Sequence, residues 1–387
     1  MPESPIRKLV PYAEKAKNRG VKVFHLNIGQ PDIETPHSAI EAVKNSNIKV
    51  LAYSKSEGDF ELRNKICDYY SKINIEINES QVIVTSGASE ALLFTIGSIM
   101  DPGDEIIIPE PFYANYNGFS VANGVNIIPI FSSIDNNFEL PKIQEFENLI
   151  SLNTKAILIC NPNNPTGYVY SYDEIKTLVE IVKKHNLFLI ADEVYREFTY
   201  DNVSHTSIMQ FDDIKQHAIV IDSVSKRYSM CGARIGCIIS KNSEFISTAM
   251  KFAQARLSPP TLAQIASTAA MDTGEDYFDK VINEYNNRRK TLVEGLNKIP
   301  GVKVSEPKGA FYCVVELPID NSEHFAKWLL EEYSLDNETI MVAPAAGFYS
   351  TPNIGQNQVR IAYVLNQNDL KSCINILKNG LMEYLKR

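Results

Sequence analysis

Seven short apolar runs between residues 82 and 240 restrict the fold more than any other feature of the sequence. The runs cover residues 82–84, 106–108, 127–130, 156–159, 187–190, 219–221 and 236–239. They are rich in β-branched residues and too short to be stable helices. This pattern is typical of strands that are buried on both faces, as in a parallel sheet.

Longer segments with helical periodicity separate several of these runs. Residues 89–100 form one such segment, and residues 172–185 form another, in which Leu178, Val179 and Val182 share one stripe. Alternating strands and helices are the pattern of an α/β protein. We therefore expect a mostly parallel seven-stranded sheet that is sandwiched by helices.

The two ends of the chain have a different pattern. Residues 1–45 contain no β/α repeat, and a polar helical pattern begins near residue 283. A small α+β pattern follows, with strands near 310–315 and 360–363, a helix over 323–333 and a last helix from residue 369. We expect a large α/β domain over 46–285 and a smaller α+β domain built from 1–45 and 286–387.

Composition excludes several classes of protein. The 387-residue chain has a formal net charge of −9 and no basic stripe, so we do not expect it to bind nucleic acid. No apolar run approaches the ~18 residues that span a membrane, and the N-terminus lacks a signal-peptide core. The six cysteines form no C-x-x-C pair. We expect free thiols, no metal site and a cytoplasmic location.

Polar clusters follow four of the predicted strands directly. They lie at residues 85–89, 161–167, 192–195 and 223–226. In open parallel sheets, ligands bind beyond the carboxyl ends of the strands. The sequence therefore predicts one binding site at this edge of the sheet, assembled from separate stretches of the chain.

Three of these clusters each have a functional and a structural interpretation. Residues 86–89 form a small-residue turn before a helix, which suits a phosphate, although such turns are common. Residues 161–167 contain two Asn-Pro pairs, which predict a rigid loop able to hold a cis proline or else a simple turn. Asp192 ends an apolar strand and needs a cationic partner or hydrogen bonds, unless it caps a helix.

The stretch from Ser223 to Gly236 is the most specific of the four. Lys226 follows a buried strand, where a lowered amine pKa would allow the lysine to form imines. Arg234 could hold a phosphate through two hydrogen bonds, and Ser223 and Ser225 add hydroxyl donors. A lone lysine is more often a surface residue, but this combination favours a phosphate-bearing ligand. Neither G-x-x-x-x-G-K-[ST] nor G-x-G-x-x-G occurs, which disfavours a nucleotide fold.

Over nearly its whole length the chain resembles the class I aminotransferases, which are pyridoxal 5′-phosphate (PLP) enzymes of fold type I. The resemblance is strongest to the aspartate and aromatic aminotransferase branch. The motifs, in order, are residues 27–32, Tyr53 with Gly58 and 62–63, 87–89, 111–113 with Tyr116, 161–167, 192–195, 223–236 and Arg360.

The resemblance implies a role for each matched position around the cofactor ring. Lys226 would carry PLP as a Schiff base and then shuttle protons, and Asp192 would pair with the pyridine nitrogen. Asn164 and Tyr195 would donate hydrogen bonds to the 3′-oxygen of the ring. Tyr113, at a position where several aspartate enzymes have tryptophan, would stack on the ring face.

The same resemblance assigns residues to the phosphate and to a second subunit. The phosphate would be held by Gly87, Ala88, Ser89, Ser223, Ser225 and Arg234. Tyr53 would reach the phosphate of the neighbouring subunit, so the resemblance implies a homodimer.

For the substrate, Arg360 would bind the α-carboxylate with help from Gly29 and Asn164. The other interpretation of Arg360 is a surface ion pair. Members that prefer aspartate use a second cation for the distal carboxylate, for which Arg256 and Lys251 are the candidates in this sequence.

The expected activity is transfer of the α-amino group of an aspartate-like, aromatic or similar amino acid to a 2-oxo acid, by a ping-pong mechanism. One alternative is a PLP-dependent C–S β-lyase or a related elimination enzyme, because the same fold and cofactor residues support both reactions. A PLP-binding regulatory protein is a third alternative. It would normally carry an added basic DNA-binding segment, for which residues 1–28 are too few.

Overall fold

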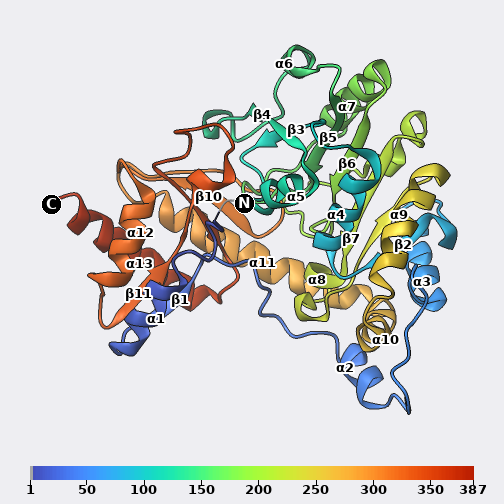
Figure 1. Ribbon diagram of the computed structural model, residues 1–387. Coiled ribbons are helices and arrows are strands. Elements are labelled where there is room, and N and C mark those ends of the chain that lie inside the picture. Colours follow the sequence, from blue (N-terminus) through green and yellow to red (C-terminus); the bar gives the residue numbers. More distant parts are fainter. Residues whose placement is uncertain (1–2) are drawn as a thin grey trace.

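The computed structural model describes residues 3–387 and contains two layered parts (Figure 1). The larger part is built on a seven-stranded sheet in the order β2-β8-β7-β6-β5-β3-β4. Its strands are β2 (Val82–Thr85), β3 (Glu105–Glu110), β4 (Asn126–Phe131), β5 (Thr154–Cys160), β6 (Phe188–Asp192), β7 (Ala218–Ser223) and β8 (Gly236–Ile239). Only β8 runs antiparallel to its neighbours. The prediction of a mostly parallel seven-stranded sheet is confirmed.

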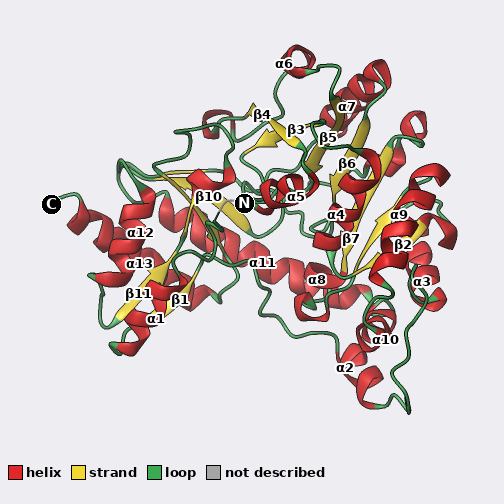
Figure 2. Cartoon of the chain, viewed as in Figure 1, coloured by secondary structure: helices red, strands yellow, loops and turns green. Residues whose placement is uncertain are grey.

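Helices cover both faces of this sheet (Figure 2). They are α3 (Phe60–Ser71), α4 (Ala88–Ile99), α5 (Asn115–Asn123), α6 (Ile143–Leu149), α7 (Tyr172–His185), α9 (Ser243–Arg256) and α10 (Thr261–Ala270). Along β6, Ile190 packs into one apolar core, whereas Leu189 and Ala191 pack into another. Since side chains of a strand alternate between faces, the sheet has a helix-covered core on each side.

Helix α7 shows how local sequence sets the limits of an element. Ser171 and Glu174 form a capping box at its start, and Lys183, Lys184 and His185 occupy its last turn. Both features stabilise the ends of a helix. The apolar stripe that predicted this helix is buried against the sheet.

The smaller part combines both ends of the chain. Strand β1 (Lys22–His25) pairs in parallel with β11 (Glu338–Met341). A four-stranded sheet has the order β12 (Ala343–Pro344), β13 (Gln358–Ala362), β10 (Tyr312–Glu316) and β9 (Lys303–Val304). Helices α1 (Val10–Asn18), α12 (Ser322–Glu331) and α13 (Gln367–Tyr384) accompany these strands.

Helix α11 (Glu275–Leu296) runs from one part into the other (Figure 1). It begins earlier than residue 283, because Gly274 caps it and Glu275 and Asp276 occupy its first turn. The expected boundary at 285/286 therefore lies inside a continuous helix. Helix α2 (His37–Lys44), from the expected small domain, contacts α10 of the large one. The division into 46–285 and the two ends stays a prediction.

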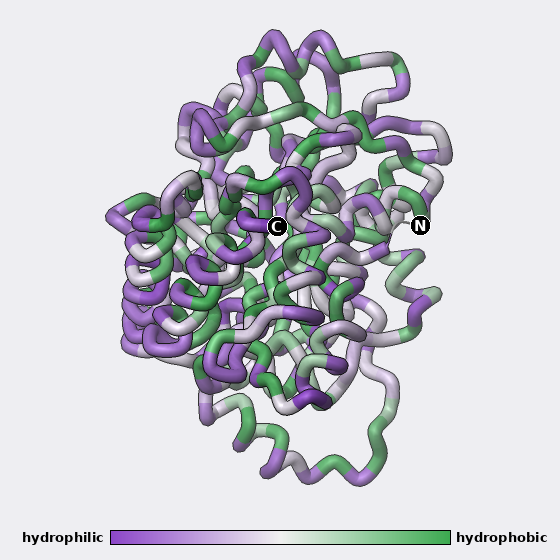
Figure 3. Tube along the Cα trace, turned by 90° about the vertical axis from the view of Figure 1, so that its left-hand side faces the viewer, coloured by the Kyte–Doolittle hydropathy of each residue, from purple (hydrophilic) through white to green (hydrophobic). Residues whose placement is uncertain are grey.

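The segment between α2 and α3 leaves the body of the protein in both views (Figures 1 and 3). It carries Val50, Leu51 and Tyr53, all of which are highly exposed. No helix within residues 3–387 has the length and apolar character needed to cross a membrane.

Candidate active site

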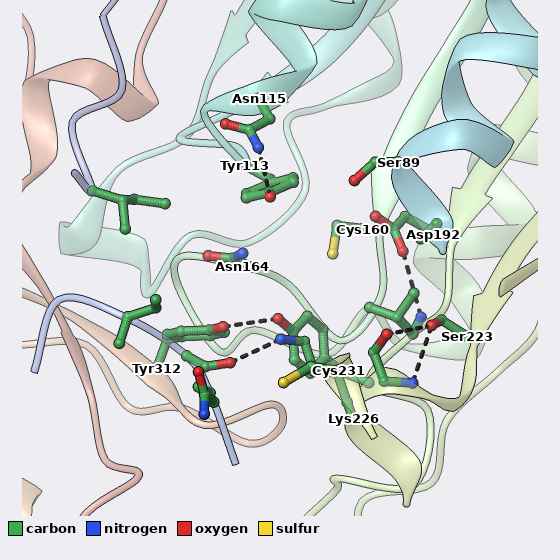
Figure 4. Close-up of a pocket in the computed structure, with 18 of the residues that line it drawn as sticks. Ser89, Tyr113, Asn115, Cys160, Asn164, Asp192, Ser223, Lys226, Cys231 and Tyr312 are labelled. Atoms are coloured by element: carbon green, nitrogen blue, oxygen red, sulfur yellow. Dashed lines mark hydrogen bonds between the residues drawn. The ribbon is translucent and has the colours of Figure 1, made fainter. Parts of the chain in front are cut away.

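A cavity of about 570 Å³ lies at the carboxyl ends of the central strands (Figure 4). Strand ends of the large part, Tyr312 and Arg360 of the small part, and the N-terminal segment all contribute side chains to its wall. The predicted site residues that line it are Gly29, Ala88, Ser89, Tyr113, Asn164, Asp192, Tyr195, Ser223, Ser225, Lys226, Arg234 and Arg360. The structure thus brings most of the predicted residues to one place.

Asp192 is the last residue of β6 and is buried at the floor of the cavity. Its Oδ2 accepts a 2.9 Å hydrogen bond from the Tyr116 hydroxyl. Within residues 3–387 no basic side chain lies close enough to form an ion pair with it, and burial raises the pKa of this carboxyl to about 6. No helix begins between Asp192 and Ile208, so the helix-cap interpretation is wrong. A cationic ligand atom would satisfy this carboxylate.

Lys226 lies on α8 (Val224–Arg227), the single turn that follows β7. Its Nζ donates a 2.8 Å hydrogen bond to the carbonyl of Gly29. Burial lowers the pKa of this amine to about 8, so about a tenth of it is neutral at pH 7. A side chain at Gly29 is excluded, because a Cβ there would lie 1.7 Å from the Tyr312 hydroxyl.

The turn before α4 and the Arg234 guanidinium form a cradle for an anion. Gly87 is the N-cap of α4 with φ +79°, and no side chain caps the helix, so its first N–H groups face the site unpaired. A Cβ on Gly87 would lie 2.3 Å from Nη2 of Arg234. The Ser223 and Ser225 hydroxyls are 2.8 Å apart beside the same cradle. These donors suit a phosphate group.

Arg360 is fully buried on β13, with only 1% of its surface exposed. Its Nη1 donates a 3.0 Å hydrogen bond to Oδ1 of Asn164, and its Nη2 donates to the carbonyl of Asn27. Its Nε has no partner, and the guanidinium lies 4.6 Å from the Tyr312 ring centre. Among the described residues no carboxylate pairs with it, so the surface ion pair is wrong. A buried guanidinium without a counter-ion is suited to bind a carboxylate.

The phenolic side chains complete the wall. The Tyr195 and Tyr312 hydroxyls are 2.8 Å apart and hydrogen-bonded. The Asn115 amide donates a 2.8 Å hydrogen bond to the Tyr113 hydroxyl, and the Tyr113 ring meets the Tyr116 ring edge-on. Figure 4 shows Tyr113 on one side of the cavity and Lys226 on the other.

Three residues singled out from the sequence lie outside the cavity of their own chain. Tyr53 is 79% exposed on the segment between α2 and α3. Arg256 pairs with Glu90 at 2.6 Å and donates to the Ser56 carbonyl. Lys251 lines a different hollow, next to Gln81. Neither candidate for the distal carboxylate therefore reaches the cavity within this chain.

Sequence reasoning missed part of the wall. Ser4, Ile6 and Arg7 line the cavity from a segment that carries no motif, and only the fold brings it there. The missed Tyr312 lies in a strand that was predicted, and the alternation of that strand could have placed it on one face with Val314.

Residues 21–377 match the family model described as aminotransferase class I and II. This chain belongs to that family. An aspartate aminotransferase of Pyrococcus horikoshii is 32% identical over 384 residues, which cover 98% of this chain and 94% of that protein. An alanine aminotransferase of Pyrococcus furiosus superimposes with a TM-score of 0.90 at 29% identity, covering 98% of each chain. An aromatic aminotransferase of P. horikoshii gives a TM-score of 0.86 at 28% identity, covering 96% of this chain and 99% of that one.

The protein is therefore a transaminase, and its fold is that of the fold type I aminotransferases. The alternative of a C–S β-lyase is not supported, because the similar proteins carry the names of transaminases. Those names cover aspartate, alanine and aromatic substrates on one fold, so the substrate must be argued from the side chains of the cavity.

Proposed function

We propose that this aminotransferase binds PLP through Lys226 and moves the α-amino group of an amino acid to a 2-oxo acid. The observation that carries the proposal is the meeting, in one cavity, of a half-buried lysine with a lowered amine pKa and a buried carboxylate that has no cationic partner. Acidic and basic side chains with strongly shifted pKa values cluster at catalytic sites.

The donor set fits PLP group by group. The unpaired Asp192 carboxylate suits a protonated pyridine nitrogen, and the cradle of Gly87 and Arg234 suits the phosphate. Tyr195 and Asn164 offer polar groups to the ring oxygen, and Tyr113 offers a ring face. When bound, PLP supplies an electron sink that makes the Cα–H bond of an amino acid acidic.

The chain's own residues then position the substrate and move its proton. Arg360 binds the α-carboxylate, which fixes the orientation of the bonds around Cα. The Lys226 amine, with a pKa of about 8, can take up a proton and return it near neutral pH. The surrounding buried wall limits the access of water to the reacting atoms.

We also propose that the amino donor carries a side-chain carboxylate. Within residues 3–387, four cationic side chains line the cavity, namely Arg7, Lys226, Arg234 and Arg360. The last three are assigned above to the cofactor and the α-carboxylate, which leaves Arg7. It makes no ion pair with any described acidic side chain. A second carboxylate on the substrate would neutralise it, as in aspartate or glutamate.

The exposed segment between α2 and α3 supports a homodimer. Val50, Leu51 and Tyr53 present a large apolar surface to solvent in a single chain, which favours burial against a partner. We propose that Tyr53 reaches the phosphate site of a second copy. The six free cysteines are consistent with a cytoplasmic location, which stays a proposal.

The test of the main proposal is Lys226→Ala. The purified wild-type enzyme should show the absorbance of covalently held PLP and convert an amino acid to its 2-oxo acid without a second substrate. Lys226→Ala should lose that absorbance and slow amino transfer by a factor of about 10³ or more. A variant that keeps normal turnover, or a wild type that releases ammonia and pyruvate from a cysteine conjugate instead, would contradict the proposal.

A further inference from the structure

Behind the cavity, on the other face of the sheet edge, lies a layer of buried charged and phenolic side chains. We call Tyr70, Glu193, Arg196, Glu197, Asp222 and Arg227 the ionic layer. Successive strand residues point to opposite faces, so Asp222 lies behind the sheet while its neighbour Ser223 lines the cavity. Glu193 and Asp192 are related in the same way.

Arg227 pairs with two carboxylates of the ionic layer. Its Nη2 lies 2.9 and 2.8 Å from the two carboxylate oxygens of Asp222, and its Nε donates a 2.7 Å hydrogen bond to Glu197. The guanidinium lies 4.1 Å from the centre of the Tyr69 ring. Asp222 of β7 and Glu197 of the chain after β6 thus fix Nη2 and Nε of Arg227, and the Tyr69 ring of α3 lies against its guanidinium.

Tyr70 joins the two halves of the layer. Its hydroxyl donates to Asp222 at 3.1 Å and accepts from Nη2 of Arg196 at 2.7 Å. Arg196 also pairs with Glu193, the residue after Asp192. One network therefore holds both the strand end that carries Asp192 and the turn that carries Lys226.

The turn that carries Lys226 needs such support. Helix α8 has only four residues, and a helix of one turn is unstable by itself. The Ser223 hydroxyl caps its start by accepting from the Ser225 N–H at 3.0 Å. At its other end the last residue, Arg227, is tied back to Asp222, which lies just before the cap. This ion pair closes the turn around Lys226.

We propose that Arg227 is a positioning residue for Lys226, and that the ionic layer fixes the direction in which the lysine enters the cavity. This inference rests on the proposed role of Lys226. Buried ion pairs often stabilise a fold no better than apolar side chains of the same size, because the charges lose their hydration. A set of buried charges directly behind the cavity is therefore better explained by the geometry it imposes than by stability alone.

The test compares holoenzymes with Arg227→Met, Arg227→Lys and the matched control Arg289→Met. Arg289 is also buried and binds both oxygens of Asp201 at 2.8 and 2.7 Å, but it lies on α11 and not on the turn that carries Lys226. Five quantities are measured: the melting temperature, the rate of PLP dissociation, the pH midpoint of the cofactor absorbance, kcat and KM.

Arg227→Met should lower kcat by about 10- to 100-fold with a smaller change in KM, because a displaced catalytic group costs this much. PLP should dissociate faster, and the absorbance midpoint should rise by about one pH unit, because water that reaches Lys226 stabilises the charged form. Arg227→Lys keeps the cation beside Asp222 and should restore part of kcat. Arg289→Met should lower the melting temperature without moving the midpoint.

The proposal fails if Arg227→Met lowers the melting temperature as Arg289→Met does but leaves the pH midpoint of the absorbance unchanged and kcat within about twofold of wild type. If Arg227→Met does not fold, Glu197→Gln decides by the same criteria, since it removes one partner of Arg227 at the more exposed end of the layer. Lys226→Ala separates the two ideas. An active Lys226→Ala enzyme refutes the proposed function, whereas unaltered Arg227 variants refute only the positioning role.

Discussion

The Tyr116 hydroxyl donates a 2.9 Å hydrogen bond to Oδ2 of Asp192 and the Val194 N–H donates to Oδ1 at 3.5 Å, so the hydrogen bonds to the buried carboxylate come from neutral groups. Burial raises the pKa of Asp192 from 3.8 to about 6, and the hydrogen bond from Tyr116 offsets only part of this effect. In the chain without cofactor, the ionised carboxylate therefore opposes folding. The same uncompensated charge is what a protonated pyridine nitrogen needs as its partner.

This relationship predicts that Asp192→Asn stabilises the apoenzyme while abolishing its function. A carboxyl whose pKa is raised in the folded state stabilises the protein at low pH. That stability is lost as pH rises from the unfolded value near 3.8 through the folded value of about 6. Above pH 6 the cost is about 3 kcal/mol, and the amide removes it. The melting temperature of the apo variant should exceed that of wild type at pH 7.5 and match it near pH 4.

Transamination by Asp192→Asn should fall by more than about 100-fold, because the cofactor nitrogen loses its anionic partner. Asp212→Asn, at an exposed carboxylate, serves as the control and should change neither property. If Asp192→Asn melts below wild type at pH 7.5, the carboxylate has a stabilising partner that the structure does not show.

The anion cradle gives a second prediction through Gly87→Ala. The new methyl group would lie 2.3 Å from Nη2 of Arg234 and would force this guanidinium out of the cradle. We expect PLP to bind at least about tenfold more weakly, because a charge-assisted phosphate contact is worth about 1.5–3 kcal/mol. Equilibrium titration of the apoenzyme with PLP measures the change.

The matched control for this substitution is Gly20→Ala. Gly20 has φ +83°, close to the +79° of Gly87, but no atom lies within 4 Å of the position of its Cβ. Both variants place alanine at a positive φ, which costs about 1–2 kcal/mol even in the left-handed helical region, and Gly87, with ψ 170°, lies outside that region. Only Gly87→Ala should weaken PLP binding. An equal loss of PLP affinity in both variants would mean that backbone strain, and not the displacement of Arg234, weakens the binding.

Local sequence predicted the central sheet and the strand ends because both depend on short-range patterns. The β-branched run before Asp192 and the stripe of α7 are properties of a few adjacent residues. The position of Arg7 at the cavity, by contrast, depends on contacts between distant parts of the chain. The Asn27 amide anchors its segment by donating to the Ile6 carbonyl at 2.7 Å, and a side chain at Gly347 would collide with Pro5. Contacts of this kind join distant parts of the chain and leave no periodic signal.

The sequence did not predict the ionic layer for a similar reason. Arg196 and Arg227 look like surface residues in the sequence, since arginine is seldom fully buried. Their burial depends on acidic and phenolic partners contributed by α3 and β7. The spacing of residues along one strand cannot reveal such partners.

The third prediction concerns Arg7, whose guanidinium remains once the other cavity cations are assigned. If Arg7 binds the side-chain carboxylate of the donor, Arg7→Gln should lower kcat/KM for aspartate or glutamate by about 10- to 100-fold, the loss expected when a charged pair becomes a neutral one. Values for alanine and phenylalanine should change by less than about threefold, because these donors have no second carboxylate. The quantity to measure is thus the kcat/KM for acidic donors divided by the kcat/KM for neutral donors.

Lys8→Gln is the matched control, since Lys8 is the next residue but pairs with Glu323 and does not line the cavity. It should leave the ratio unchanged even if it loosens the N-terminal segment. A uniform loss with all donors in Arg7→Gln would show that the segment only closes the cavity. A selective loss with the acidic donors would place substrate choice on Arg7, a residue from a part of the wall that no motif marks.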